Sequence, residues 1–91
     1  MTRREPVEVW PPAAYIESEL EERGWCLDDL LAKASPDDVA VSAVMEGQRM
    51  TRRAARALAD TFQTTVQLWL RLDAVWWEWL EIQRRRTEGK A

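Results

Sequence analysis

Apolar residues recur every three or four positions along most of this chain, which is the spacing that puts them on one face of an α-helix. In the first such segment, Pro12 can open a helix whose inward face holds Ile16 and Leu20. Gly24 is a typical residue after the end of a helix, and Trp25 can fold back on the last turn. We therefore predict a first helix that begins at Pro12 and ends at Gly24.

A second and a third helix follow closely. The apolar stripe of the second consists of Leu27, Leu30, Leu31 and Ala34. Ser35 is placed to cap the third helix, with Pro36 in its first turn and Asp38 at the return position of a capping box. Gly47 ends the third helix, whose inward residues are Val41, Val44 and Met45. Two short helices joined this tightly predict a helix-turn-helix.

The remaining segments predict two more helices. Thr51 can cap the fourth, with Met50 placed to pack against Ala54 or Ala55. Thr64 or Thr65 can cap the fifth, which is expected to run to about Arg86 and contains four of the six tryptophans. The buried stripe of the fourth helix is predicted to be Ala55, Leu58, Ala59 and Phe62.

The last helix is too apolar for a single interface. At 100° per residue, Leu68, Leu72, Val75, Trp79 and Ile82 form one stripe, and Val66, Trp69, Leu70, Trp76, Trp77 and Leu80 form a second, adjacent one. One stripe can cover the core of the domain, with Trp69 against Leu58 and Phe62, and the other would be an exposed patch unless it meets another chain. A core that wraps both stripes is the alternative, but 91 residues offer limited covering surface. We expect a two-fold homodimer through the first stripe.

These elements predict an all-α fold: a five-helix bundle with a Cro/repressor-like helix-turn-helix and a long, tryptophan-rich C-terminal helix. The chain is long enough for one domain and one core. We expect an N-terminal arm at residues 1–10, the domain with its dimerisation helix at residues 11–86, and a tail at residues 87–91.

Composition narrows the function to binding. The chain has no histidine and one cysteine, Cys26, which excludes Ser-His and Cys-His catalysis, histidine metal sites and an internal disulfide. The carboxylates fall on predicted outer helix faces, away from any Gly-rich phosphate loop. No segment has the length of apolar residues that a membrane span needs, and the N-terminus lacks a signal-peptide core. We expect a cytoplasmic protein without cofactor, metal or enzymatic activity.

The net charge of −3 conceals two halves of opposite sign. Residues 1–47 hold four basic and eleven acidic residues, a net charge of −7, whereas residues 48–91 hold nine basic and five acidic residues, a net charge of +4. Any contact with nucleic acid must therefore come from a local basic patch.

The segment Trp10–Trp25, with its run Trp-Pro-Pro-Ala-Ala-Tyr-Ile, resembles the opening of HigA-type antitoxins, members of the Cro/repressor-like helix-turn-helix (XRE) group. The likeness extends over residues 10–73 without a gap, through Leu30, Val41, Val44, Met45, Gly47, Met50, Thr51, Leu58, Ala59 and the run 64–72. It implies a homodimeric, DNA-binding autorepressor that also neutralises a RelE-like toxin.

The predicted recognition helix departs from that pattern. Its outward positions and start hold Asp37, Asp38, Ala40, Ser42 and Ala43, with Val39 between them and Glu46 near the end. Aspartate can only accept from cytosine and repels nearby phosphates, so this helix is poorly suited to reading base edges.

The sequence holds better candidates for contacts to phosphates than for contacts to bases. Arg49, Thr51, Arg52, Arg53 and Arg56 gather around the start of the fourth helix, where free N–H groups and the helix dipole favour an anion. The alternative is that these arginines only solubilise the surface and pair with the many acids.

Two functions remain open. The first is a dimeric DNA-binding regulator of the antitoxin or autorepressor type, with the arginine cluster on operator phosphates and Ser42 and Asp38 as base contacts. The second is a helix-turn-helix fold used to bind a basic protein partner, such as a toxin, through its acidic residues. That acidic surface would consist of Glu21, Glu22, Asp28, Asp29, Asp37 and Asp38.

Overall fold

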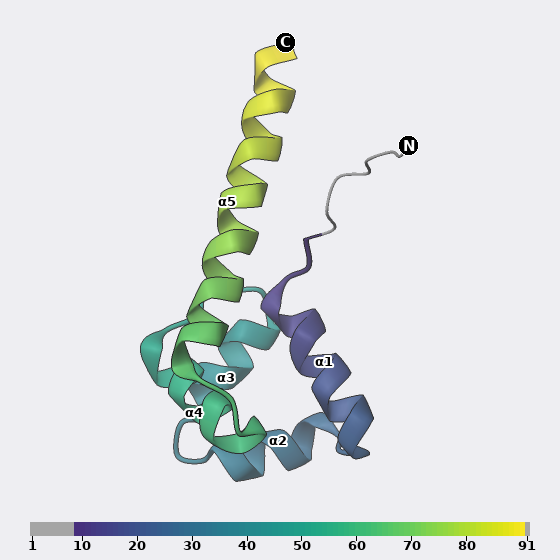
Figure 1. The fold of residues 1–91 in the computed structure, drawn as a ribbon, viewed down its shortest axis with the longest axis vertical. Helices are drawn as coiled ribbons and strands as arrows, with labels where there is room; N and C mark the ends of the chain where they lie inside the picture. The colour runs from purple at the N-terminus through teal and green to yellow at the C-terminus, as the bar shows by residue number, and fades with distance from the viewer. Residues whose placement is uncertain (1–8, 91) are drawn as a thin grey trace.

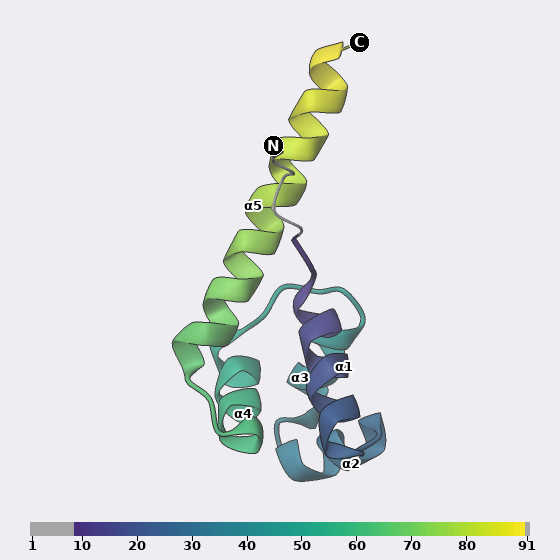
Figure 2. The same cartoon turned by 45° about the vertical axis from the view of Figure 1, so that its right-hand side comes forward.

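The computed structural model describes the backbone of residues 9–90 and the side chains of residues 9–87. Within this range the chain is all-helical, with five helices and no strand, which confirms the predicted all-α, five-helix fold. Four short helices form a compact body at one end, and the C-terminal half of the fifth projects from it (Figures 1 and 2). The helices are α1 (Pro12–Arg23), α2 (Leu27–Ala34), α3 (Asp38–Met45), α4 (Arg52–Phe62) and α5 (Val66–Lys90).

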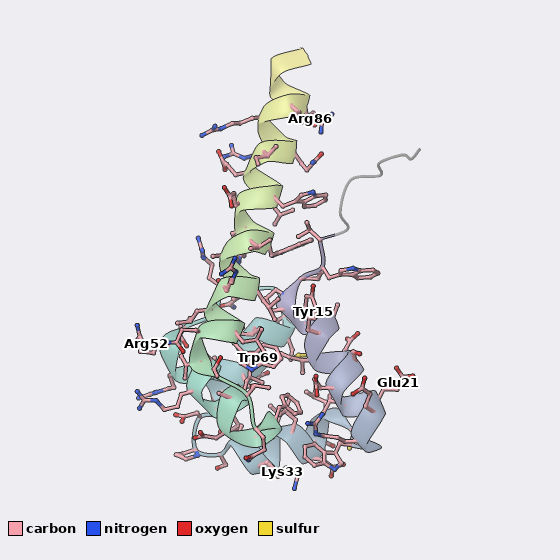
Figure 3. The ribbon with its side chains drawn as sticks, in the orientation of Figure 1. Tyr15, Glu21, Lys33, Arg52, Trp69 and Arg86 are labelled. Carbon is pink, nitrogen blue, oxygen red and sulfur yellow. The ribbon has the colours of Figure 1, made fainter. Side chains whose placement is uncertain are left out.

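The core lies where α4 and the start of α5 meet the first three helices. Trp69 on α5 is its largest buried side chain and points into the body, as Figure 3 shows. Its ring centroid lies 6.0 Å from that of Phe62, and its indole N–H donates to the hydroxyl of Thr64 over 2.8 Å. Leu58 belongs to the same buried cluster. The predicted inward orientation of Trp69 is therefore confirmed.

Most helix ends follow the local signals in the sequence. Gly24 adopts a left-handed conformation with φ of 70°, which a residue without a Cβ does at little cost. The N–H of Trp25 then donates back to the carbonyl of Leu20 over 2.9 Å, as in a Schellman motif. At the start of α4, the Thr51 hydroxyl accepts from the N–H of Ala54 over 3.1 Å. Of the two candidate caps of α5, it is Thr65 that accepts, from the N–H of Leu68.

The predicted start of α3 is wrong. Ser35 was expected to cap this helix, but its N–H donates to the carbonyl of Leu31, so Ser35 closes α2 instead. The helix begins two residues later than the capping-box pattern indicates, with Asp37 as its N-cap. The side chain of Asp37 makes no capping hydrogen bond, because it faces Arg53 of α4.

The cap of α2 was not predicted, and the end of α5 differs from the prediction. At the start of α2, a carboxylate oxygen of Asp29 accepts from the N–H of Cys26 over 2.9 Å, half of a capping box in which a cysteine occupies the N-cap. Helix α5 continues to Lys90, past the predicted end at about Arg86 and into the predicted tail. In that last stretch the Thr87 hydroxyl donates to the carbonyl of Gln83, a bond that fits a continuing helix. No helix among the described residues is long and apolar enough to cross a membrane.

Candidate nucleic-acid interface

The start of α4 lies next to the start of α3, because α3 packs against both α2 and α4. A shallow hollow of about 390 Å³ marks this junction, lined by Pro36, Asp37, Val39, Ala40, Thr51 and Arg53. The hollow brings Asp37 and Ala40 of the predicted recognition residues together with Thr51 and Arg53 of the predicted phosphate ligands; the other members of the two sets do not line it.

The outward face of α3 is narrower than the sequence pattern indicated. Asp38, Ser42 and Ala43 line a second hollow of about 440 Å³, together with Glu46 near the end of the helix. Ala40 does not share this face fully, since its side chain is half-buried and packs against the core. Val39 is 76% exposed and is the most prominent apolar side chain of α3. The face that would meet bases is therefore acidic and apolar.

The arginines at the start of α4 differ in what they contact. The Nε of Arg53 lies 3.3 Å from a carboxylate oxygen of Asp37, so part of its charge is already balanced. Arg52 and Arg56 are exposed and form no ion pair with any residue of the described range. Figure 3 shows Arg52 pointing outward from the body. These two arginines are the free cations at this end of α4.

Arg49 has a different environment. Its guanidinium stacks over the ring of Trp77, 5.1 Å from the centroid, and lies 3.7 Å from the carboxylate of Asp73. Asp73 is only 4% exposed and also accepts from the indole N–H of Trp77 over 3.0 Å. Sequence reasoning missed Asp73, which lies four residues before Trp77 on α5, a spacing that puts both on one side of the helix.

The residues of the predicted acidic surface lie on α1, on α2 and at the start of α3, where Asp37 faces Arg53. Between residues 9 and 47 the chain has only two bases, Arg23 and Lys33. Both stack on the ring of Trp25, at 5.6 and 4.7 Å from its centroid, and Arg23 also contacts Glu19. Glu21 and Glu22 are exposed, and Glu21 points into solvent in Figure 3. This surface therefore keeps most of its negative charge.

The first apolar stripe of α5 faces outward. Leu68, Val75 and Ile82 are 41%, 42% and 46% exposed, whereas Leu72 and Trp79 are half-buried. In the second stripe, Trp69 is buried and Val66 and Leu70 pack against the core. Leu72 of the first stripe also packs against the core, so the predicted dimer stripe and the side of α5 that covers the domain meet at this residue.

Comparisons with protein-family models, with curated protein sequences and with solved structures find no match for the chain.

Proposed function

We propose that this chain is a DNA-binding transcriptional regulator, an autorepressor of the HigA antitoxin type that acts in the cytoplasm as a homodimer. The observation that carries the proposal is the pair Arg52 and Arg56, exposed and without an ion pair in the described range, on the helix whose Arg53 contacts Asp37 at the start of α3. Arginine at the start of a helix is unfavourable next to the positive end of the helix dipole, and an anionic partner would relieve it. Phosphate is the anion that nucleic acid supplies along its whole length.

The geometry favours contacts to the DNA backbone over contacts to the bases. Arg52 and Arg56 would bind phosphates, and the Thr51 hydroxyl, which accepts from Ala54, keeps its proton to donate. On α3, Ser42 is the one residue of the outward face that can both donate to and accept from a base edge. Most of the affinity would then depend on salt and little of it on sequence.

The test is a titration of the protein with the promoter DNA of its own operon at several salt concentrations. We expect log K to fall linearly with log salt, by about 0.9 per phosphate contact in each subunit. An unrelated duplex of equal length measures the part of the affinity that is independent of sequence. Absence of binding to the promoter at about 50 mM salt, where phosphate contacts are least screened, would rule out the DNA function.

A second candidate function, binding of a basic protein such as a RelE-like toxin, is favoured by one observation. Val39 is 76% exposed in the middle of the face that would meet DNA, next to the half-buried Asp38. An apolar residue beside carboxylates suits a protein surface with arginines better than it suits phosphates. Replacing Val39 and Asp38 by alanine should weaken toxin binding and leave affinity for DNA unchanged or higher. The opposite pattern would favour DNA as the partner.

A further inference from the structure

The exposed stripe of α5 has the spacing of a coiled-coil seam. Its residues Leu68, Leu72, Val75, Trp79 and Ile82 are separated by four, three, four and three positions. This alternation places apolar side chains at the a and d positions of a heptad, with Leu72 and Trp79 at a and the other three at d. The seam runs from the part of α5 that covers the core to the part that projects from the body (Figure 1).

Charged residues flank this seam on its solvent side at a seven-residue interval. Arg71, Glu78 and Arg85 occupy successive g positions of the same heptads. Arg85 is engaged, with its Nε 3.3 Å from a carboxylate oxygen of Glu81. Arg71 and Glu78 are exposed, and neither forms an ion pair with another residue of the described chain. Two opposite charges one heptad apart are thus available to a partner.

We propose that a second copy of this chain covers the seam with its own α5 in the antiparallel direction. The heptads then place Leu68 against the partner's Trp79 and Leu72 against the partner's Val75, so that large and small side chains face each other. Two-fold symmetry repeats both contacts. On the solvent side, Arg71 faces the partner's Glu78, and the same pair forms a second time across the axis.

The charges at the g positions favour this register over a shifted antiparallel register and over a parallel pair. In antiparallel coiled coils, g positions face g positions, so a shift of one heptad would place Glu78 against the partner's Glu78 and Arg71 against the partner's Arg85. In a parallel pair, g faces e, and Arg71 would meet the partner's Trp76 while Glu78 met the partner's Gln83. Both alternatives lose the two attractive pairs, and the shifted register adds repulsion.

This inference rests on the proposed function for the role of the dimer. Dimer formation itself is measured without DNA. Loss of DNA binding with an intact dimer would count against the regulator alone. A monomeric protein that binds promoter DNA would count against the antiparallel pair alone.

The experiment is a charge exchange followed by sedimentation velocity on the full chain. R71E and E78R should each raise the dimer Kd by about tenfold or more, because two repulsive contacts replace two attractive ones. The double variant R71E/E78R should restore the dimer. An equimolar mixture of R71E and E78R should form a heterodimer, since every pair across its interface is then attractive.

R85E is the matched control: it reverses an exposed charge of the same helix that has no partner in this register, and should leave the Kd unchanged. Replacing both Leu68 and Val75, the exposed seam residues, by glutamate should yield a folded monomer, with helix content checked by circular dichroism. The proposal is overturned if the wild type is monomeric at tens of micromolar, or if the double variant does not recover the dimer. A weaker dimer with R85E, or a tighter dimer with R71E, would indicate another register and would also overturn the proposal.

Discussion

The guanidinium of Arg49 lies 3.7 Å from the carboxylate of Asp73, which joins the segment before α4 to the middle of α5. Asp73 is the one buried charged residue of the described chain. Trp77 completes the contact, because it donates to Asp73 and carries Arg49 on its ring. The basic segment that we propose to meet phosphates is thus held in place by the helix that we propose to form the dimer.

We expect Asp73→Ala to lower the free energy of unfolding by about 1–3 kcal/mol. The substitution leaves the indole N–H of Trp77 without its acceptor and Arg49 without its counter-charge, and an orphaned partly buried donor costs about this much. Urea unfolding followed by circular dichroism gives the value. Gln67→Ala, at an exposed position of the same helix, serves as the control. Equal effects of the two substitutions would show that the buried contact contributes nothing.

Trp69→Ala should cost about 3–5 kcal/mol, the range for truncating a large aromatic side chain in a core. The matched comparison is Trp10→Ala, which removes a tryptophan that is 51% exposed and should cost far less. Thermal or urea unfolding of both variants gives the difference. A loss below about 1 kcal/mol at Trp69, typical of surface sites, would mean that α5 is turned the other way.

The third prediction concerns the stability of the fold at low pH. The N–H of Cys26, and then its thiol, donate to the carboxylate of Asp29 and hold the pKa of Asp29 below its ordinary value of 3.8. A depressed pKa means that the contribution to stability is present above 3.8 and is lost as the pH falls through the lower, folded-state pKa.

Asp29→Asn should therefore reduce stability at neutral pH, and the difference from the wild type should vanish in acid below that pKa. Urea unfolding between neutral pH and about pH 2 measures this. Asp28→Asn, at the neighbouring exposed carboxylate, is the control. A difference between wild type and Asp29→Asn that persisted in acid would indicate that Asp29 acts by packing and not by its charge.

Local signals in the sequence were sufficient for most of the fold. A glycine at Gly24 and a threonine at Thr51 each satisfy the free backbone groups of one helix end, so the neighbouring residues alone specify the boundary. The start of α3 could not be read in this way. Ser35 lies between two helices and could cap either one. In the structure its N–H donates to the carbonyl of Leu31, so that Ser35 ends α2 and does not cap α3.

The candidate site was predictable as a set of residues but not as a set of contacts. Arg49 and Asp73 are 24 positions apart, and no periodicity predicts which helix residue a loop residue will contact. Likewise, Arg52 and Arg53 are equivalent in a sequence-based prediction. Only the packing of α3 against α4 shows that Asp37 is within reach of Arg53 and not of Arg52.

That difference provides the last prediction. If phosphates are the partner, Arg52→Ala should weaken binding to all duplexes about equally and lower the salt slope by about 0.9 in each subunit. Arg53→Ala should have a smaller effect, because the ion pair with Asp37 already balances part of its charge. Asp37→Asn should strengthen binding, since it removes a negative charge and releases Arg53. This gain should disappear in the double variant Asp37→Asn/Arg53→Ala if Arg53 mediates it.

If the partner is a basic protein, the signs reverse: the arginine substitutions have little effect, and loss of Asp37 weakens the complex. Fluorescence anisotropy with labelled promoter DNA separates the two functions, and tighter DNA binding by Asp37→Asn is the result that a protein-binding surface does not explain.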